Sequence, residues 1–247
     1  MRSKLRWAIV PGLVLAASVV LAACGSDSDD SGDEGASQAE VSGALEEFAP
    51  ATAAPEGAQQ GGELTVLAAA DVGAGYTDPG IAYYQFAYMV TAATQRALLS
   101  WQPDDVEKPT PDLAEAEPEI SDDFKTITFT IRDGVKFAPP VDREVVCDDV
   151  KYAIDRGLMP GVGNGYIGAY LGDLAGFAEA QKQAEQNQTK APDIAGVQCT
   201  DDKTLELTLD RPTAAVAVQA LSLPLSAPVP EEYAKQFDAE QPSTYAD

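Results

Sequence analysis

The sequence has 247 residues, with 16 basic and 40 acidic side chains, no histidine and a formal net charge of −24. A chain this acidic repels phosphate backbones, so we exclude nucleic acid as a partner. The absence of histidine removes the commonest general base and the imidazole metal ligand, which excludes Ser-His-Asp and Cys-His hydrolases and most zinc sites.

Residues 1–23 have the pattern of a secretory signal peptide. Three basic residues precede an apolar run over residues 7–20, which is shorter than the roughly 20 apolar residues of a membrane span. The run ends in Leu21-Ala22-Ala23-Cys24, which resembles the lipobox of bacterial lipoproteins. This resemblance implies that Cys24 carries the lipid anchor and becomes the mature N-terminus. The alternative is an ordinary secretory signal that ends near a cysteine.

Residues 24–60 are rich in Asp, Glu, Ser, Gly, Ala and Pro, which predicts a disordered acidic linker. Folded structure is expected from Gly61 onward. Residues 63–67 alternate polar and apolar side chains and predict a half-buried strand. A turn at Asp78-Pro79-Gly80 then leads into residues 82–101, whose apolar positions fall near helical spacing and predict a helix packed on the sheet.

The rest of the chain continues to alternate strands and helices. Residues 127–131 predict a strand followed by a turn, and Asp148 and Asp149 are expected to cap a helix that ends near Arg156. Two further strands around residues 197–199 and 204–209 flank a hairpin turn, and Pro212 opens an apolar helix through Ala220. The pattern indicates an α/β fold of the mixed α+β kind, without an internal repeat.

Cys147 and Cys199 remain once Cys24 is acylated. An even pair in an exported domain is most simply a disulfide, because the compartment is oxidising. The alternative is two buried reduced thiols, since sequence does not show whether the two Cα atoms come close enough.

Several segments together resemble the family 5 extracellular solute-binding proteins, the oligopeptide- and dipeptide-binding receptors of ABC importers. They occur in the family's order, and they are residues 78–79, 111–114, 124–137, 148–156, 196–197 and 201–205. The resemblance implies a periplasmic-binding-protein-like lobe I with its small subdomain. Members of this family are roughly twice as long, so residues 61–247 are expected to be the N-terminal part of the solute-binding domain, without the second lobe.

The same resemblance names candidate ligand contacts. By this resemblance, Ala82, Tyr83 and Tyr84 would line the first-lobe side of a cleft, and Tyr166 would point toward a bound peptide. Tyrosine suits this role because it offers a rigid apolar face and one hydroxyl at low entropic cost. The alternative for each tyrosine is packing within the fold. We expect no catalytic residue, no metal and no cofactor, because the paired acidic residues lie at turns or a helix start, where Asp occurs for structural reasons.

The expected function is that of a lipid-anchored receptor on the extracytoplasmic face of the bacterial cell membrane. It would capture peptides or similar small solutes and present them to the permease subunits of an ABC transporter. The alternatives are a truncated remnant or surface lipoprotein without transport activity, and an exported hydrolase that uses carboxylates.

The lipobox predicts the effect of changing Cys24→Ala. Because the variant lacks the thiol that receives the acyl chains, it should leave the membrane fraction or remain unprocessed, which fractionation and N-terminal mass spectrometry would show. A variant that is cleaved and still fractionates with the membrane would contradict the lipid assignment.

Overall fold

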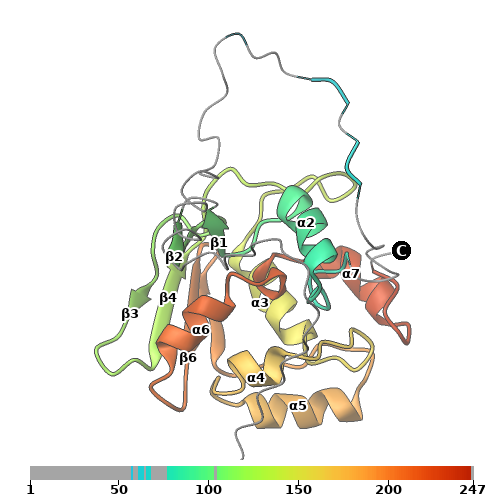
Figure 1. The fold of residues 1–247 in the computed structure, drawn as a ribbon. Helices are drawn as coiled ribbons and strands as arrows, with labels where there is room; N and C mark the ends of the chain where they lie inside the picture. Colours follow the sequence, from blue (N-terminus) through green and yellow to red (C-terminus); the bar gives the residue numbers. More distant parts are fainter. Residues whose placement is uncertain (1–56, 58–60, 64, 68–76, 103–104, 246–247) are drawn as a thin grey trace, which may run out of the picture. The chain divides into compact units, whose positions relative to one another are not determined.

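The computed structural model describes residues 57, 61–63, 65–67, 77–102 and 105–245, all within the second of two units, Ala49–Asp247 (Figure 1). The predicted signal peptide, Cys24 and all of the predicted linker except Gly57 lie outside the described residues. Within the described ranges, no helix is both long and apolar enough to cross a membrane.

An antiparallel four-stranded sheet carries much of the core. Its strands lie in the order β3 (Glu119–Ile120), β4 (Thr126–Thr130), β6 (Thr204–Thr208) and β5 (Val197–Asp201). Ile127 lies opposite Leu207 and Phe129 opposite Leu205, and these four side chains are buried. Threonines and Glu206 alternate with them along the two strands, so one face packs on the core and the other is polar.

Helices cover the apolar face of this sheet (Figure 1). Helix α3 (Cys147–Arg156) packs on β5 and β6, α6 (Ala214–Ala220) packs on β4, and α4 (Ile167–Leu171) packs on α6. The remaining elements are α2 (Gln85–Thr94), the two-stranded sheet of β1 (Leu99–Gln102) and β2 (Asp105–Pro111), α5 (Phe177–Gln186), the 3-10 turn η1 (Pro224–Ser226) and α7 (Glu231–Asp238). The mixed α+β class is therefore confirmed.

The predicted strands after residue 126 and their turns are confirmed, whereas the helix starts shift. The predicted hairpin joins β5 to β6, and α6 begins at Ala214 rather than Pro212. In α3, Val146 occupies the N-cap position, and Asp149 in the first turn accepts a hydrogen bond from the Val146 N–H at 2.9 Å. The acidic residues thus stabilise the start of α3 from inside its first turn.

Two predictions before residue 102 are wrong. The described residues at 63–67 form no strand, and Val66 and Leu67 are 60% and 93% exposed. The single helix predicted over residues 82–101 is instead α2 followed by strand β1. Gln95 has extended backbone angles and ends the helix. Residues 99–102 pair with β2 as a strand, although their apolar side chains continue the helical spacing in the sequence. Strand structure depends on a hydrogen-bonding partner elsewhere in the chain, which alternation alone does not reveal.

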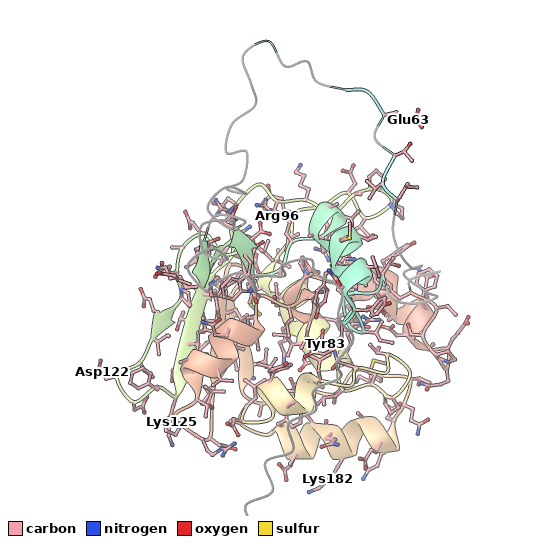
Figure 2. All side chains as sticks on the ribbon, in the orientation of Figure 1. Glu63, Tyr83, Arg96, Asp122, Lys125 and Lys182 are labelled. Carbon is pink, nitrogen blue, oxygen red and sulfur yellow. A yellow bond between two sulfur atoms is a disulfide. The ribbon has the colours of Figure 1, made fainter. Side chains whose placement is uncertain are left out.

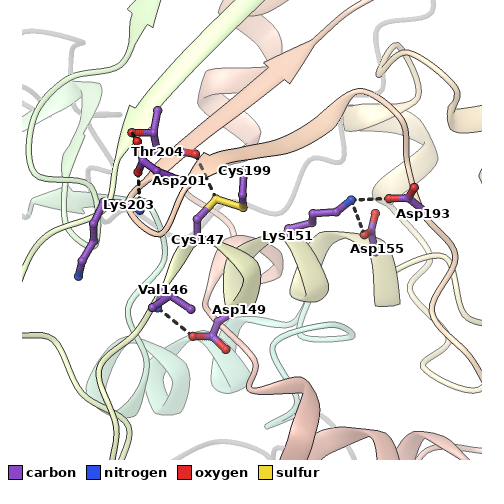
Figure 3. Close-up of a disulfide and its surroundings, with 10 residues drawn as sticks. All are labelled: Val146, Cys147, Asp149, Lys151, Asp155, Asp193, Cys199, Asp201, Lys203 and Thr204. Atoms are coloured by element: carbon purple, nitrogen blue, oxygen red, sulfur yellow. Dashed lines mark hydrogen bonds and ion pairs between the residues drawn. A yellow bond between two sulfur atoms is a disulfide. The ribbon is translucent and has the colours of Figure 1, made fainter.

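A disulfide joins Cys147 at the start of α3 to Cys199 in β5, with 5.8 Å between the Cα atoms (Figure 3). The predicted pairing is confirmed. Cys147 is fully buried. The bridge fixes α3 against the sheet on which it packs.

Arg156, near the end of α3, is fully buried and binds carboxylates from two distant segments. Its Nη1 and Nη2 donate to the two oxygens of Asp78 at 2.7 and 3.0 Å. Its Nε and Nη2 donate to the two oxygens of Asp238, the last residue of α7, at 2.9 and 2.6 Å. The guanidinium also lies over the ring of Tyr245, 5.0 Å from its centre. One side chain thus connects the 78–80 turn, α3 and the C-terminal described segment.

Burial opposes the charged forms of both Arg156 and Asp238, yet their hydrogen bonds outweigh it. They raise the pKa of Arg156 and, with the hydroxyls of Ser243 and Tyr152, lower the pKa of Asp238. Arg156 and Asp238 therefore stay ionised at neutral pH.

Replacing Arg156→Met should lower the free energy of unfolding by about 3–5 kcal/mol, because two buried carboxylates lose their partner. Urea denaturation would measure this loss. The matched control is Arg211→Met, which breaks an exposed pair with Asp173 and should cost less than about 1 kcal/mol. Equal losses would contradict the central role of Arg156.

The same variant should change the acid sensitivity. The lowered pKa of Asp238 contributes stability above its unfolded pKa of about 4, and this contribution is lost as the pH falls through the folded pKa. In the Arg156→Met variant, the free energy of unfolding should therefore fall less on acidification than it does in the parent.

Removing the disulfide by the double change Cys147→Ser and Cys199→Ser should lower the free energy of unfolding by about 4 kcal/mol in the chain-entropy account, since the bridge closes a loop with a sequence separation of 52. Denaturation with and without a reductant would test this. The parent should lose stability on reduction, and the variant should not respond.

Candidate functional site

Four tyrosines form a contiguous group, which we call the tyrosine cluster: Tyr83, Tyr88, Tyr166 and Tyr170. Tyr88 lies in α2 and Tyr170 in α4, whereas Tyr83 and Tyr166 lie just before these helices. The ring of Tyr83 stacks on that of Tyr166, with 4.5 Å between centres and 26° between planes. The hydroxyls of Tyr83 and Tyr170 are 2.6 Å apart and share a hydrogen bond. Tyr88 meets Tyr83 edge to face at 6.4 Å. These are the offset and T-shaped geometries that aromatic rings prefer.

The two layers of the cluster differ in exposure. Tyr166 is only 5% exposed, and its hydroxyl donates to the carbonyl oxygen of Ala82 at 3.3 Å. Tyr83 covers it and is itself 51% exposed. The cluster therefore presents the outer surface of Tyr83, supported from below by a fixed ring.

The turn at residues 78–80 sets the position of Ala82 and Tyr83. Asp78 accepts a hydrogen bond from the Gly80 N–H at 2.7 Å through its side chain, and its carbonyl oxygen accepts one from the Ala82 N–H at 3.0 Å. A Cβ at Gly80 would lie 2.8 Å from Nη1 of Arg156, so the turn needs glycine at that position.

Asn164 sets the position of Tyr166. Its Oδ1 accepts hydrogen bonds from the N–H groups of Tyr166 and Ile167 at 2.9 and 2.7 Å, at the start of α4. Its Nδ2 donates to the carbonyl oxygen of Gly80. The loop before α4 is thereby tied to the turn before α2, and Tyr83 and Tyr166 meet as a result.

The hydroxyls of Tyr83, Tyr88 and Tyr166 remain protonated at neutral pH. The hydrogen bond to Tyr170, followed by burial, raises the pKa of Tyr83, and burial raises the pKa of Tyr88 to about 12. Burial also raises the pKa of Tyr166. A protonated tyrosine hydroxyl can donate as well as accept a hydrogen bond, so the exposed hydroxyl of Tyr83 can serve a ligand in either role.

Of the four candidate ligand contacts from the sequence, the structure brings three together. Ala82 is buried and contributes its carbonyl oxygen, Tyr166 is buried, and Tyr83 is exposed. Tyr84 is 44% exposed and packs toward Phe86, with 5.6 Å between ring centres. Whether these residues contact a ligand stays a prediction.

Sequence reasoning missed Tyr88 and Tyr170. Tyr170 lies four residues after Tyr166, which places both on one helical face and was an available signal. Tyr88 joins through a contact with Tyr83 that no sequence spacing indicates. Among the described residues, no group of three or more Cys, Asp or Glu side chains is arranged to hold a metal ion.

The fold is similar to solved oligopeptide-binding structures. Haemophilus influenzae OppA in complex with RPPGFSPFR gives a TM-score of 0.55 at 24% identity, with 66% of this chain and 30% of that chain covered. Listeria monocytogenes OppA bound to peptide gives 0.54 at 24% identity, with the same shares covered. The substrate-binding domain of an oligopeptide ABC transporter from Bacillus anthracis str. Ames gives 0.51 at 25% identity, with 65% and 29% covered.

These similarities identify the fold as part of a periplasmic-binding-protein fold, and the chain spans about 30% of the length of those proteins. A comparison with curated proteins gave no match. The sequence profile of the bacterial extracellular solute-binding proteins, family 5, middle part, matches residues 108–246, which is more than half of the chain. The chain therefore belongs to the family 5 bacterial extracellular solute-binding proteins.

Proposed function

We propose that this chain is part of the substrate-binding component of an ABC importer and captures peptides or similar small solutes. Family membership supports this role, and the Listeria monocytogenes and Haemophilus influenzae OppA structures it resembles are complexes with peptides. The protein binds and releases its ligand without covalent chemistry. Closure around the ligand follows from tighter binding in the closed state.

The exposed ring of Tyr83 is the observation that carries the proposal. Stacking on Tyr166 and the hydroxyl bond to Tyr170 hold this ring in place before any ligand arrives. A ligand that packs on a fixed ring does not have to order it, so less conformational entropy is lost on binding. Aromatic or proline side chains and backbone amides of a peptide suit such a surface, because they supply flat apolar faces and groups for the hydroxyls.

The proposal includes the organisation expected from the sequence. Residues 1–23 direct export, Cys24 anchors the protein at the extracytoplasmic face of the membrane, and residues 24–60 hold residues 61–247 away from it. The anchor would keep the binding domain close to its partner, the permease.

Calorimetry of the chain with a peptide pool tests the binding role. Tyr83 is half exposed, so a ligand that packs on its outer face keeps much of its own surface in water. We therefore expect weak binding, with a Kd in the high micromolar to millimolar range, or about −4 to −6 kcal/mol. Changing Tyr83→Ala should weaken binding at least about fivefold, because the stacking surface is lost.

The matched control is Phe124→Ala. Phe124 is also 51% exposed, and its neighbours Asp122 and Lys125 lie well away from Tyr83 (Figure 2). This control should bind as the parent does. Equal binding by the Tyr83 and Phe124 variants would contradict the site. Product formation from the peptides would contradict the non-enzymatic role.

A further inference from the structure

The turn that follows α5 carries an acceptor pattern for N-linked glycosylation. The sequence has two asparagines, and only Asn187 is followed two positions later by Ser or Thr, in Asn187-Gln188-Thr189. The residue between them is glutamine, and the pattern excludes only proline there. Such a pattern has meaning on an exposed loop of an exported protein, so the position of Asn187 in the fold is what tests it.

Asn187 lies on the surface directly after the helix. Its N–H makes the last hydrogen bond of α5, and residues 185–190 are all exposed. The Lys190 N–H donates to the carbonyl oxygen of Asn187 at 3.4 Å and closes a turn. Nε2 of Gln241 holds this turn by donating to the carbonyl oxygen of Gln188 at 2.7 Å. That contact is exposed, so water can replace it at little cost and the turn can enter an enzyme.

The atom that would receive a sugar, Nδ2 of Asn187, is unengaged. No described residue accepts a hydrogen bond from it. The Oδ1 atom of the same amide accepts a long hydrogen bond from the Thr189 hydroxyl, at 3.4 Å. The amide and the hydroxyl thus lie together on the surface, where one enzyme can bind both.

An exposed carboxylate completes the segment. Glu185 lies two positions before Asn187, in the last turn of α5, and it forms no ion pair with any residue of the described ranges. A basic group of an enzyme can therefore pair with this carboxylate without displacing another partner. Such charge-assisted hydrogen bonds are stronger than neutral ones.

We infer that Asn187 is a site of N-linked glycosylation by a transferase that binds the Glu185 carboxylate and the Thr189 hydroxyl. The donor is a sugar linked through C1 to a lipid diphosphate. Nδ2 forms a bond to C1, the bond between C1 and the diphosphate oxygen breaks, and the lipid diphosphate leaves with its electron pair. One amide proton passes to a base of the enzyme.

The inference rests on the export that the proposed function includes, and it does not depend on peptide binding. The family is one of extracellular proteins, which supports export. The surface around Tyr83 contributes nothing to the acceptor segment, so the two proposals succeed or fail separately.

Mass spectrometry of the full chain from its native host tests the inference. Trypsin cuts after Lys182 and Lys190, so residues 183–190 form one peptide with Asn187 as its only asparagine. In the exported chain we expect this peptide to carry the mass of a sugar, and electron-transfer fragmentation should place that mass on Asn187. Asn164 is the internal control and should stay unmodified, because no Ser or Thr follows it at the required spacing.

Four variants at exposed positions assign the roles. Asn187→Gln should abolish the modification, whereas Thr189→Ser keeps the hydroxyl and should retain it. Glu185→Gln should lower the modified fraction at least about fivefold, because a hydrogen bond to a charged group is lost. Its matched control is Glu179→Gln on the same helix, which should be modified as the parent is.

An exported chain without a sugar on Asn187 overturns the inference. A sugar that persists in Asn187→Gln also overturns it, since the sugar then lies on another residue. Equal modified fractions in the two glutamate variants overturn the role of Glu185. A chain that is not exported contradicts the export on which the inference rests, and peptide calorimetry reports on the binding role independently of all these outcomes.

Discussion

The buried ion network of Arg156 is the interaction on which the rest of this domain depends. Arg156 is buried and binds the carboxylates of Asp78 and Asp238. Each of these residues is about eighty positions away from Arg156 in the chain. A buried charge of this kind is tolerable only when every partner is in place, so the network forms entirely or the domain is destabilised. Arg143 repeats the arrangement nearer the surface, where it binds Asp149 of α3 and Glu232 of α7.

The ion network of Arg156 also fixes the position of the candidate binding surface around Tyr83. Arg156 holds Asp78, Asp78 shapes the turn that ends at Ala82, and Asn164 ties the same turn to the start of α4. Tyr83 and Tyr166 are therefore brought together by polar contacts beneath them as well as by their own stacking. The charged and polar residues therefore position the segments, and the tyrosine rings provide the surface for a ligand. A rigid base of this kind is what a preorganised binding site requires.

Two surfaces with different chemistry adjoin helix α2. Just before the helix, Tyr83 offers an aromatic face with a hydroxyl, and on the side of the helix that faces β1 lies a pocket of about 340 Å³ whose wall includes Tyr88 and Trp101. Tyr88 touches both surfaces, since it meets Tyr83 edge to face and lines the pocket. The proposed peptide-binding function rests on the first surface and on membership of the solute-binding family.

The sequence by itself determined the parts of the fold whose pattern and partners are local. Strands β4 and β6 alternate clearly, the β5–β6 hairpin closes over a short turn, and the pairing of Cys147 with Cys199 followed from an even count in an exported chain. Only the tertiary structure decided the strand β1, the exposure of Val66 and Leu67, the partners of Arg156 and the stacking of Tyr83 on Tyr166. The physical reason is that periodicity records which face of an element is apolar, whereas ion pairs, strand partners and ring contacts depend on segments that only the folded chain brings together.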